Sequence, residues 1–238
     1  MGAVIDPVAD RLTDDELVAA LAPMSLRSTL DAPSVAAAAG RGLRDADDVA
    51  ALVAHYEQGL FDSPFAAPVA GSAPAGRRTE VAASVAFQAV VAQFATPVLL
   101  AHRVLGVGIR APLAEVRWRA VGWGTRFGLA VLPRAEPQDL VDLIPLLRAD
   151  LVEPWLEVIG LHRLVPDRVL VGNADAALWT AVRSVEARAP LTDGERQAVV
   201  AAGLGPTRDT CCLIHHAGLV PCDECPRSTG TTDGVTAI

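Results

Sequence analysis

An uncharged stretch from Val81 to Ala101 is the strongest constraint on how this chain folds. It is about as long as a membrane-spanning helix, and a helix that is apolar on all sides lies either in a protein core or in a bilayer. The stretch is rich in alanine, no aromatic belt flanks it, and its polar side chains would need partners in lipid. We therefore expect a buried central helix over residues 78–103, kinked or split at Pro97. Peripheral contact of residues 81–101 with a membrane is the alternative.

The rest of the pattern predicts an α+β fold that is predominantly helical. Capping boxes at Thr13–Glu16 and Thr192–Glu195 mark two helix starts, because each pairs a hydroxyl and a carboxylate with orphan backbone amides. Further helices are expected over residues 45–57, 166–188 and 136–164, the last with breaks at Pro145 and Pro154. Partly alternating segments bounded by Pro and Gly predict a small antiparallel sheet; they are residues 104–110, 115–121 and 127–132.

Four regions follow from this pattern. We expect an N-terminal helical region over residues 1–76 and a core of helices and sheet over residues 77–205. A metal-binding segment over residues 206–226 and a disordered tail over residues 227–238 complete the chain. Pro, Gly, Ala and Ser break all periodicity between Phe61 and Gly76, which indicates a loop or linker.

The formal net charge of −8 argues against binding to nucleic acid, which requires a basic surface. The amino terminus lacks the basic and apolar regions of a secretory signal, so we expect a cytoplasmic protein. Cytoplasmic thiols stay reduced, and clustered cysteines there are more often metal ligands than disulfides.

All four cysteines lie close together near the carboxy terminus: Cys211, Cys212, Cys222 and Cys225. Four soft donors within reach of one another predict a four-thiolate metal site. Structural zinc sites usually combine two Cys-x-x-Cys knuckles, and the adjacent pair Cys211 and Cys212 cannot form one. The spacing favours an iron-sulfur cluster, because a two-iron core spreads its thiolates over two metals. Zinc and a redox dithiol remain as alternatives.

The cysteine stretch resembles the carboxy-terminal motif of the FhuF-type ferric-siderophore reductases, a Cys-Cys pair followed after about ten residues by Cys-x-x-Cys. Arg208, Cys211, Cys212 and Leu213 fit the start of that motif, and nine residues separate Cys212 from Cys222. The segment Arg168–Ala174 resembles the family's Gly-Asn helix upstream, through Gly172 and Asn173. This chain has Asp223-Glu224 where the family commonly has Gly-Asp. The similarity is specific only over roughly the last seventy residues.

The resemblance implies a [2Fe-2S] cluster on Cys211, Cys212, Cys222 and Cys225. It also implies one-electron reduction of Fe(III) in a ferric siderophore, of the hydroxamate class, with release of Fe(II). The electron would come from an external donor such as a ferredoxin or a reduced cofactor system, because no dinucleotide-binding fingerprint is visible. The alternative function is a non-enzymatic four-cysteine metal protein, with structural zinc or an iron-sulfur sensor role.

Three residues near the expected ligands are predicted to act on the cluster without binding it. Asp223 and Glu224 would place negative charge beside it and lower its potential; the alternative is two solvated acids. His215, like its neighbour His216, could couple electron transfer to a proton, since histidine titrates near neutral pH. Ligation by histidine is unnecessary when four cysteines are present.

The predicted substrate pocket lies over the expected sheet and is inferred from its arginines and tryptophans. Arg117, Arg119 and Arg126 lie near Trp118 and Trp123 in the sequence. Arginine could hydrogen-bond the oxygens of a chelate while tryptophan covers its apolar linkers. The alternative is that these arginines form the solvated face of the sheet. His102, Tyr56 and Trp179 are expected to be packing residues.

Overall fold

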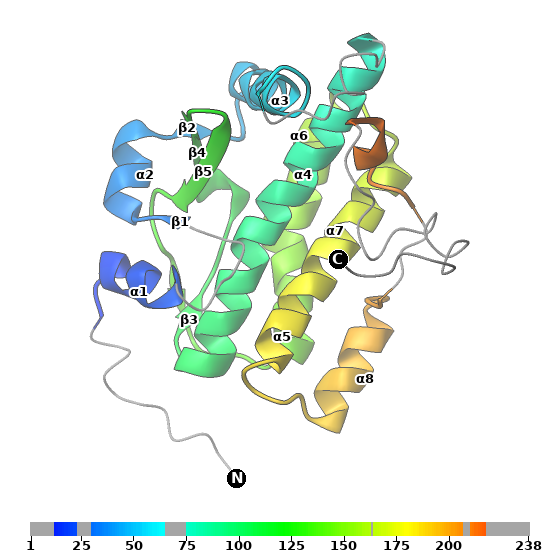
Figure 1. Ribbon diagram of the computed structural model, residues 1–238. Coiled ribbons are helices and arrows are strands. Elements are labelled where there is room, and N and C mark those ends of the chain that lie inside the picture. Colours follow the sequence, from blue (N-terminus) through cyan, green and yellow to red (C-terminus); the bar gives the residue numbers. More distant parts are fainter. Residues whose placement is uncertain (1–11, 23–29, 65–74, 163, 207–209, 218–238) are drawn as a thin grey trace, which may run out of the picture.

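The computed structural model describes residues 12–22, 30–64, 75–162, 164–206 and 210–217 (Figure 1). Within these ranges the fold is α+β and predominantly helical, as the sequence predicts. The sheet lies to one side of a layer of helices whose centre is α4. Most of the predicted loop between Phe61 and Gly76, and all of the predicted tail over 227–238, lie outside the described residues.

Helix α4 (Ala75–Leu100) forms the centre of the core and continues into one π-helical turn, η4 (Ala101–Leu105). Most of its side chains from Val81 onward are buried, and it packs against α3 (Ala46–Phe61) and α7 (Asp167–Glu186). Pro97 lies within the helix, so the helix is not split there.

Length and composition alone would let this helix cross a membrane. In the part of the chain that the structure describes, residues 77–105 are the one helical stretch that meets these criteria. Of its most apolar window, 72% is buried inside the protein. The helix therefore fulfils the expectation of a buried central element, with its apolar surface covered by protein.

The remaining helices surround this centre. Both predicted capping boxes are present, with Thr13 at the start of α1 and Thr192 at the start of α8, and Asp45 caps α3. Pro145 lies inside α5, and a π-helical turn, η6, separates α5 from α6. The bounds are α1 (Asp14–Leu21), α2 (Pro33–Ala39), α5 (Leu140–Leu147), η6 (Arg148–Val152), α6 (Glu153–Gly160), α8 (Asp193–Ala201) and the 3-10 turns η5 (Leu113–Glu115) and η7 (Ile214–Ala217).

The main sheet has the strand order β1-β5-β4-β2. Strands β4 and β5 form an antiparallel hairpin, in which Gly122 adopts a φ of 59° in the turn. Strand β2 pairs antiparallel with β4, and β1 pairs parallel with β5. A separate antiparallel pair joins β3 and β6. The bounds are β1 (Leu30–Asp31), β2 (Arg41–Gly42), β3 (Gly108–Ile109), β4 (Val116–Val121), β5 (Gly124–Leu129) and β6 (Arg134–Ala135).

The sequence predicts three of the six described strands, and the limits of these three differ from those observed. Residues 104 and 105 belong to η4, so the strand expected over 104–110 is reduced to β3. The strand expected over 127–132 begins earlier, at Gly124, because the tight turn at Gly122 brings the chain back at once. The parallel pairing of β1 was not predicted, since a strand of two residues has no periodicity to read.

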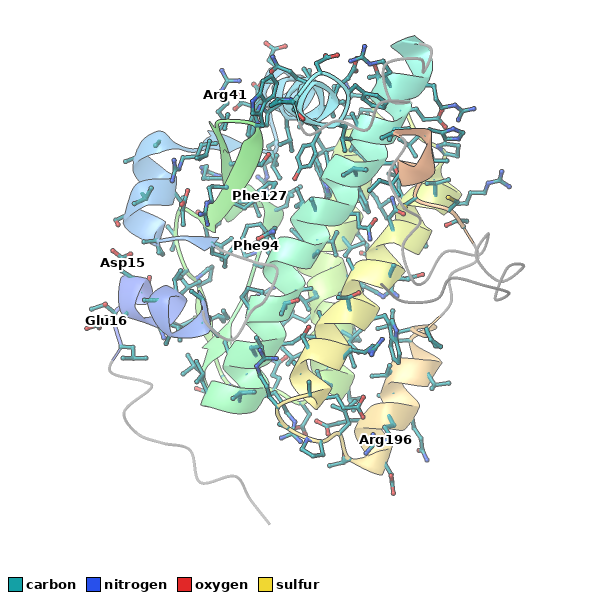
Figure 2. All side chains as sticks on the ribbon, in the orientation of Figure 1. Asp15, Glu16, Arg41, Phe94, Phe127 and Arg196 are labelled. Atoms are coloured by element: carbon teal, nitrogen blue, oxygen red, sulfur yellow. The ribbon has the colours of Figure 1, made fainter. Side chains whose placement is uncertain are left out.

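The core joins the regions on both sides of residue 76. One hydrophobic cluster extends from Leu17 in α1 to Leu204 after α8, and β1 and β2 complete the main sheet. Phe94 of α4 meets Phe127 of β5 edge to face, with ring centroids 6.3 Å apart (Figure 2). This contact between α4 and the hairpin links the helical layer to the sheet.

His102 is buried in η4, and backbone groups surround its ring. The Gln138 N–H donates to Nδ1 at 3.0 Å, and Nε2 lies 2.8 Å from the carbonyl oxygen of Ile109. The Ile109 N–H also points at Nε2, at 2.9 Å, so both ring nitrogens face a backbone N–H group. This arrangement suits the neutral ring, because a doubly protonated ring has no nitrogen left to accept. Burial lowers the pKa of His102 below 6.5, and the hydrogen bond to Ile109 opposes this shift only in part.

This lowered pKa predicts a loss of stability in mild acid. The unfolded chain takes up the histidine proton near pH 6.5, before the folded protein does, so the contribution of His102 is complete above that pH. It is lost as the pH falls toward the lower pKa of the folded state. We expect the free energy of unfolding in urea to drop between pH 7.5 and 5.5 by less in His102→Gln than in the unchanged protein. Equal drops in the two proteins would contradict the assignment.

Candidate metal centre

The described chain ends in a short segment, residues 210–217, that carries Cys211 and Cys212. Cys212 is buried, with 3% of its surface exposed, and Cys211 is half-buried. Leu213 follows with a φ of 68°, in the left-handed region, and the turn η7 begins directly after it. This sharp turn directs the Leu213 N–H to Cys211 Sγ, at 3.4 Å. A sulfur that accepts a backbone N–H is suited to carry the negative charge of a thiolate ligand.

The carboxy-terminal end of this segment packs against the core helices α3 and α4. Ala217 is fully buried in a small hydrophobic cluster with Phe61 of α3 and Val81 of α4. Leu213 packs against this cluster and against the main core. Figure 1 shows η7 beside the first half of α4, which agrees with the contacts between these two elements. The segment that carries the cysteine pair is therefore anchored by apolar burial.

A buried polar network fixes the same segment to α4 and α7. The Ser84 hydroxyl of α4 donates to the backbone carbonyl oxygen of Cys212 at 2.8 Å. The Asn173 amide nitrogen of α7 donates to Ser84 Oγ at 2.8 Å and to the Ser84 carbonyl oxygen at 3.1 Å. Ser84 and Asn173 are both 0% exposed. Both helices thus contribute to holding the backbone at Cys212.

Gly172 allows the chain before the cysteines to pass close to α7. A Cβ at this position would lie 2.0 Å from Thr210 Oγ1 and 3.3 Å from Thr210 Cβ. The Thr210 hydroxyl also donates to the Arg168 carbonyl oxygen at 3.3 Å. Glycine inside a helix costs about 1 kcal/mol relative to alanine, and this close approach explains why it stands here.

The described part of the chain holds two of the four expected ligands, the thiols of Cys211 and Cys212. Cys222 and Cys225 lie outside the described residues, as do Arg208, Asp223 and Glu224, and the side chain of His215 is likewise outside what is described. His216 is half-buried on η7. Among the described residues, no three His, Cys, Asp or Glu side chains gather where they could hold a metal ion. The four-thiolate ligand set therefore stays a prediction.

The arginines predicted to bind substrate lie on one face of the sheet. Arg119 forms a two-pronged ion pair with Asp31 of β1, at 2.7 and 3.0 Å, which reaches across β5. Arg117 donates to the carbonyl oxygens of Ala114 and Val116. Arg126 is directly opposite Arg119 in the strand register. Two of the three guanidinium groups thus have partners within the fold.

The tryptophans predicted to share that pocket lie elsewhere. Trp118 is 4% exposed and alternates onto the opposite face, opposite Phe127 in the strand register and 6.2 Å from the His55 ring. Trp123 is 43% exposed in the turn between β4 and β5. Because successive residues of a strand point to opposite faces, Trp118 and its neighbours Arg117 and Arg119 do not line one surface.

Sequence reasoning missed Ser84 and Thr210 as parts of the cysteine site. Ser84 is a polar residue in an otherwise apolar helix, which signals a need for a hydrogen-bond partner but does not identify it. Gly172 and Asn173 were noted only through the resemblance.

A comparison with protein-family models finds no match to this chain, and a comparison with curated proteins finds none either.

The close approach at Gly172 predicts an unusual response to alanine. Gly172→Ala should raise hydrogen exchange over residues 210–217, because the new Cβ displaces Thr210. Mass spectrometry of the exchanged protein measures this directly. Adding Thr210→Ala should restore protection in part, because it removes the hydroxyl that the Cβ meets but also the bond of that hydroxyl to Arg168. Gly160→Ala is the matched control, since a Cβ there meets no described atom within 4 Å. Unchanged exchange in Gly172→Ala would refute the contact.

Proposed function

We propose that this chain is a ferric-siderophore reductase similar to the FhuF type, with a [2Fe-2S] cluster bound by Cys211, Cys212, Cys222 and Cys225. One observation carries the proposal. Gly172 and Asn173, which the resemblance singles out far upstream of the cysteines, meet the cysteine segment at Thr210 and, through Ser84, at Cys212. The two separate stretches that carry the resemblance are thus neighbours in the fold, which supports a shared role.

Iron chemistry explains why the reaction needs few protein groups. The hard oxygen donors of a siderophore hold Fe(III) more tightly than Fe(II), because the lower charge weakens the bonds and the divalent ion prefers softer donors. One electron delivered to the ferric chelate therefore lets the iron leave. When bound, a [2Fe-2S] cluster supplies one-electron chemistry.

The residues of this chain would hold the thiolates and control access to them. Cys212 is buried, so its sulfur is shielded from bulk water, whereas the half-buried Cys211 leaves one side of the pair accessible. The Leu213 N–H bonded to Cys211 Sγ would stabilise negative charge on that sulfur. Asp223, Glu224 and His215 complete the proposed surroundings of the cluster.

The proposed partners are a ferric siderophore of the hydroxamate class and an external electron donor such as a ferredoxin. We propose a cytoplasmic location, where a reduced donor and an imported chelate would meet. The charge of −8 gives the protein a surface that disfavours nucleic acid. Peripheral contact with a membrane is compatible with this proposal, although most of the apolar window of α4 is covered by protein.

An anaerobic titration tests the function. The purified protein is reduced with dithionite, freed of excess reductant, and mixed with a ferric trihydroxamate. We expect the visible spectrum of the oxidised cluster to return and Fe(II) to appear in a ferrous-specific chelator in proportion. The same hydroxamate loaded with Ga(III) is the control, because it has the charge of the ferric complex but no accessible reduced state.

Two results would contradict the function. A colourless protein that contains zinc would favour the non-enzymatic alternative, and a reduced spectrum that persists with the ferric chelate would exclude reductase activity. Cys212→Ser provides a further check, because oxygen in place of a buried sulfur should abolish or strongly alter the visible spectrum. Far-UV circular dichroism establishes that this variant keeps the fold.

A further inference from the structure

Ser84 departs from the usual behaviour of serine in a helix. A helical serine normally bonds back to the carbonyl oxygen four residues earlier, as Ser184 of α7 does with Thr180 at 2.9 Å. The Ser84 hydroxyl instead donates to the carbonyl of Cys212, 128 positions away in the sequence, at 2.8 Å. The hydroxyl therefore serves the cysteine segment and not its own helix.

Asn173 fixes the direction in which Ser84 points. Its amide nitrogen donates to Ser84 Oγ, so the Ser84 oxygen accepts from Asn173 and its own proton is directed to Cys212. Asparagine is a poor helix former, and a fully buried polar side chain is costly unless its hydrogen bonds are made. Helix stability alone would favour an apolar residue at this position, which points to a different reason for asparagine.

We propose that Ser84 and Asn173 are positioning residues that hold the Cys211–Cys212 pair in place for metal ligation. The Asn173–Ser84 pair fixes the Cys212 backbone between α4 and α7, the two helices with the most extensive mutual contact among the described elements. The left-handed turn at Leu213 then sets the direction of Cys211 Sγ. Preorganised ligands lose less freedom when they bind a metal, which raises metal affinity.

This inference rests on the proposed metal site but not on the proposed reaction. A four-cysteine site with zinc would need the same fixed backbone at Cys212. The coupling is also reciprocal, because anything that binds only the ordered segment stabilises the order. Removal of the metal should therefore lower protection of residues 210–217 and of the adjoining turns of α4 and α7 at Ser84 and Asn173.

The test compares Ser84→Ala with the control Ser184→Ala, which removes a hydroxyl that bonds only within α7. Both proteins are purified with their metal and challenged with EDTA, and metal release is followed over time. We expect release from Ser84→Ala to be about 10 to 100 times faster, the usual effect of removing an outer partner of a metal ligand. Release from Ser184→Ala should match the unchanged protein, and Ser84→Thr, which keeps the hydroxyl, should release metal more slowly than Ser84→Ala.

A second variant removes the hydrogen bond to Ser84 from the α7 side, so that the inference does not depend on one substitution in α4. Asn173→Leu is close in size to asparagine and has no hydrogen-bond donor for Ser84, so it should also speed metal release and raise exchange over residues 210–217. Wild-type release rates and wild-type exchange in both Ser84→Ala and Asn173→Leu would overturn the inference. If the unchanged protein holds zinc, the reductase function fails, yet faster zinc release from Ser84→Ala would still support the positioning role.

Discussion

The contact between α4 and α7 supports the rest of the structure. Helix α4 is buried over most of its length and α7 at half of its positions, and both present alanines to the core, so that their backbones approach closely. Around this pair the fold adds α3 and α6, with Phe87 of α4 stacked on Trp155 at 6.2 Å. Near the start of α7 the interface changes character and contains Ser84 and Asn173. A close-packed apolar contact thus ends in a polar one, and there the cysteine segment lies.

The polar end of the α4–α7 interface has an energetic explanation. A buried hydroxyl and amide in an apolar interface weaken it unless every polar atom finds a partner, and a satisfied network contributes specificity more than stability. The donation from Ser84 to Cys212 links residues from opposite halves of the sequence. An apolar pair at positions 84 and 173 would fill the space between α4 and α7 equally well, but it would leave the Cys212 carbonyl without this hydrogen bond. The hydrogen bond to the segment over residues 210–217 therefore explains why Ser84 and Asn173 stand in this interface.

How far the sequence predicted this molecule depends on how local each signal is. The capping boxes at Thr13 and Thr192 were predicted correctly because their hydrogen bonds join residues three positions apart. The buried helix over 81–101 was predicted from composition alone. The strands β1 and β2 were missed because two residues show no periodicity, and only pairing with the distant β4–β5 hairpin creates them. The partner of Ser84 was missed for the same reason, since no local pattern relates it to Cys212.

Leu213, the residue after the cysteine pair, links the cysteine motif to the packing of the core. A left-handed conformation costs a non-glycine residue on the order of 1 to 3 kcal/mol, so glycine would be the easy choice at position 213. The chain has leucine, whose side chain packs on both hydrophobic clusters. Full burial of a leucine side chain stabilises by about 1.5 to 3 kcal/mol, and the partly buried Leu213 gains a share of this that offsets part of the strain. Glycine would allow the turn but could not hold the segment against the core, whereas leucine does both. The Cys-Cys-Leu sequence therefore has a physical reading in which the leucine secures the turn that aims the Cys211 sulfur.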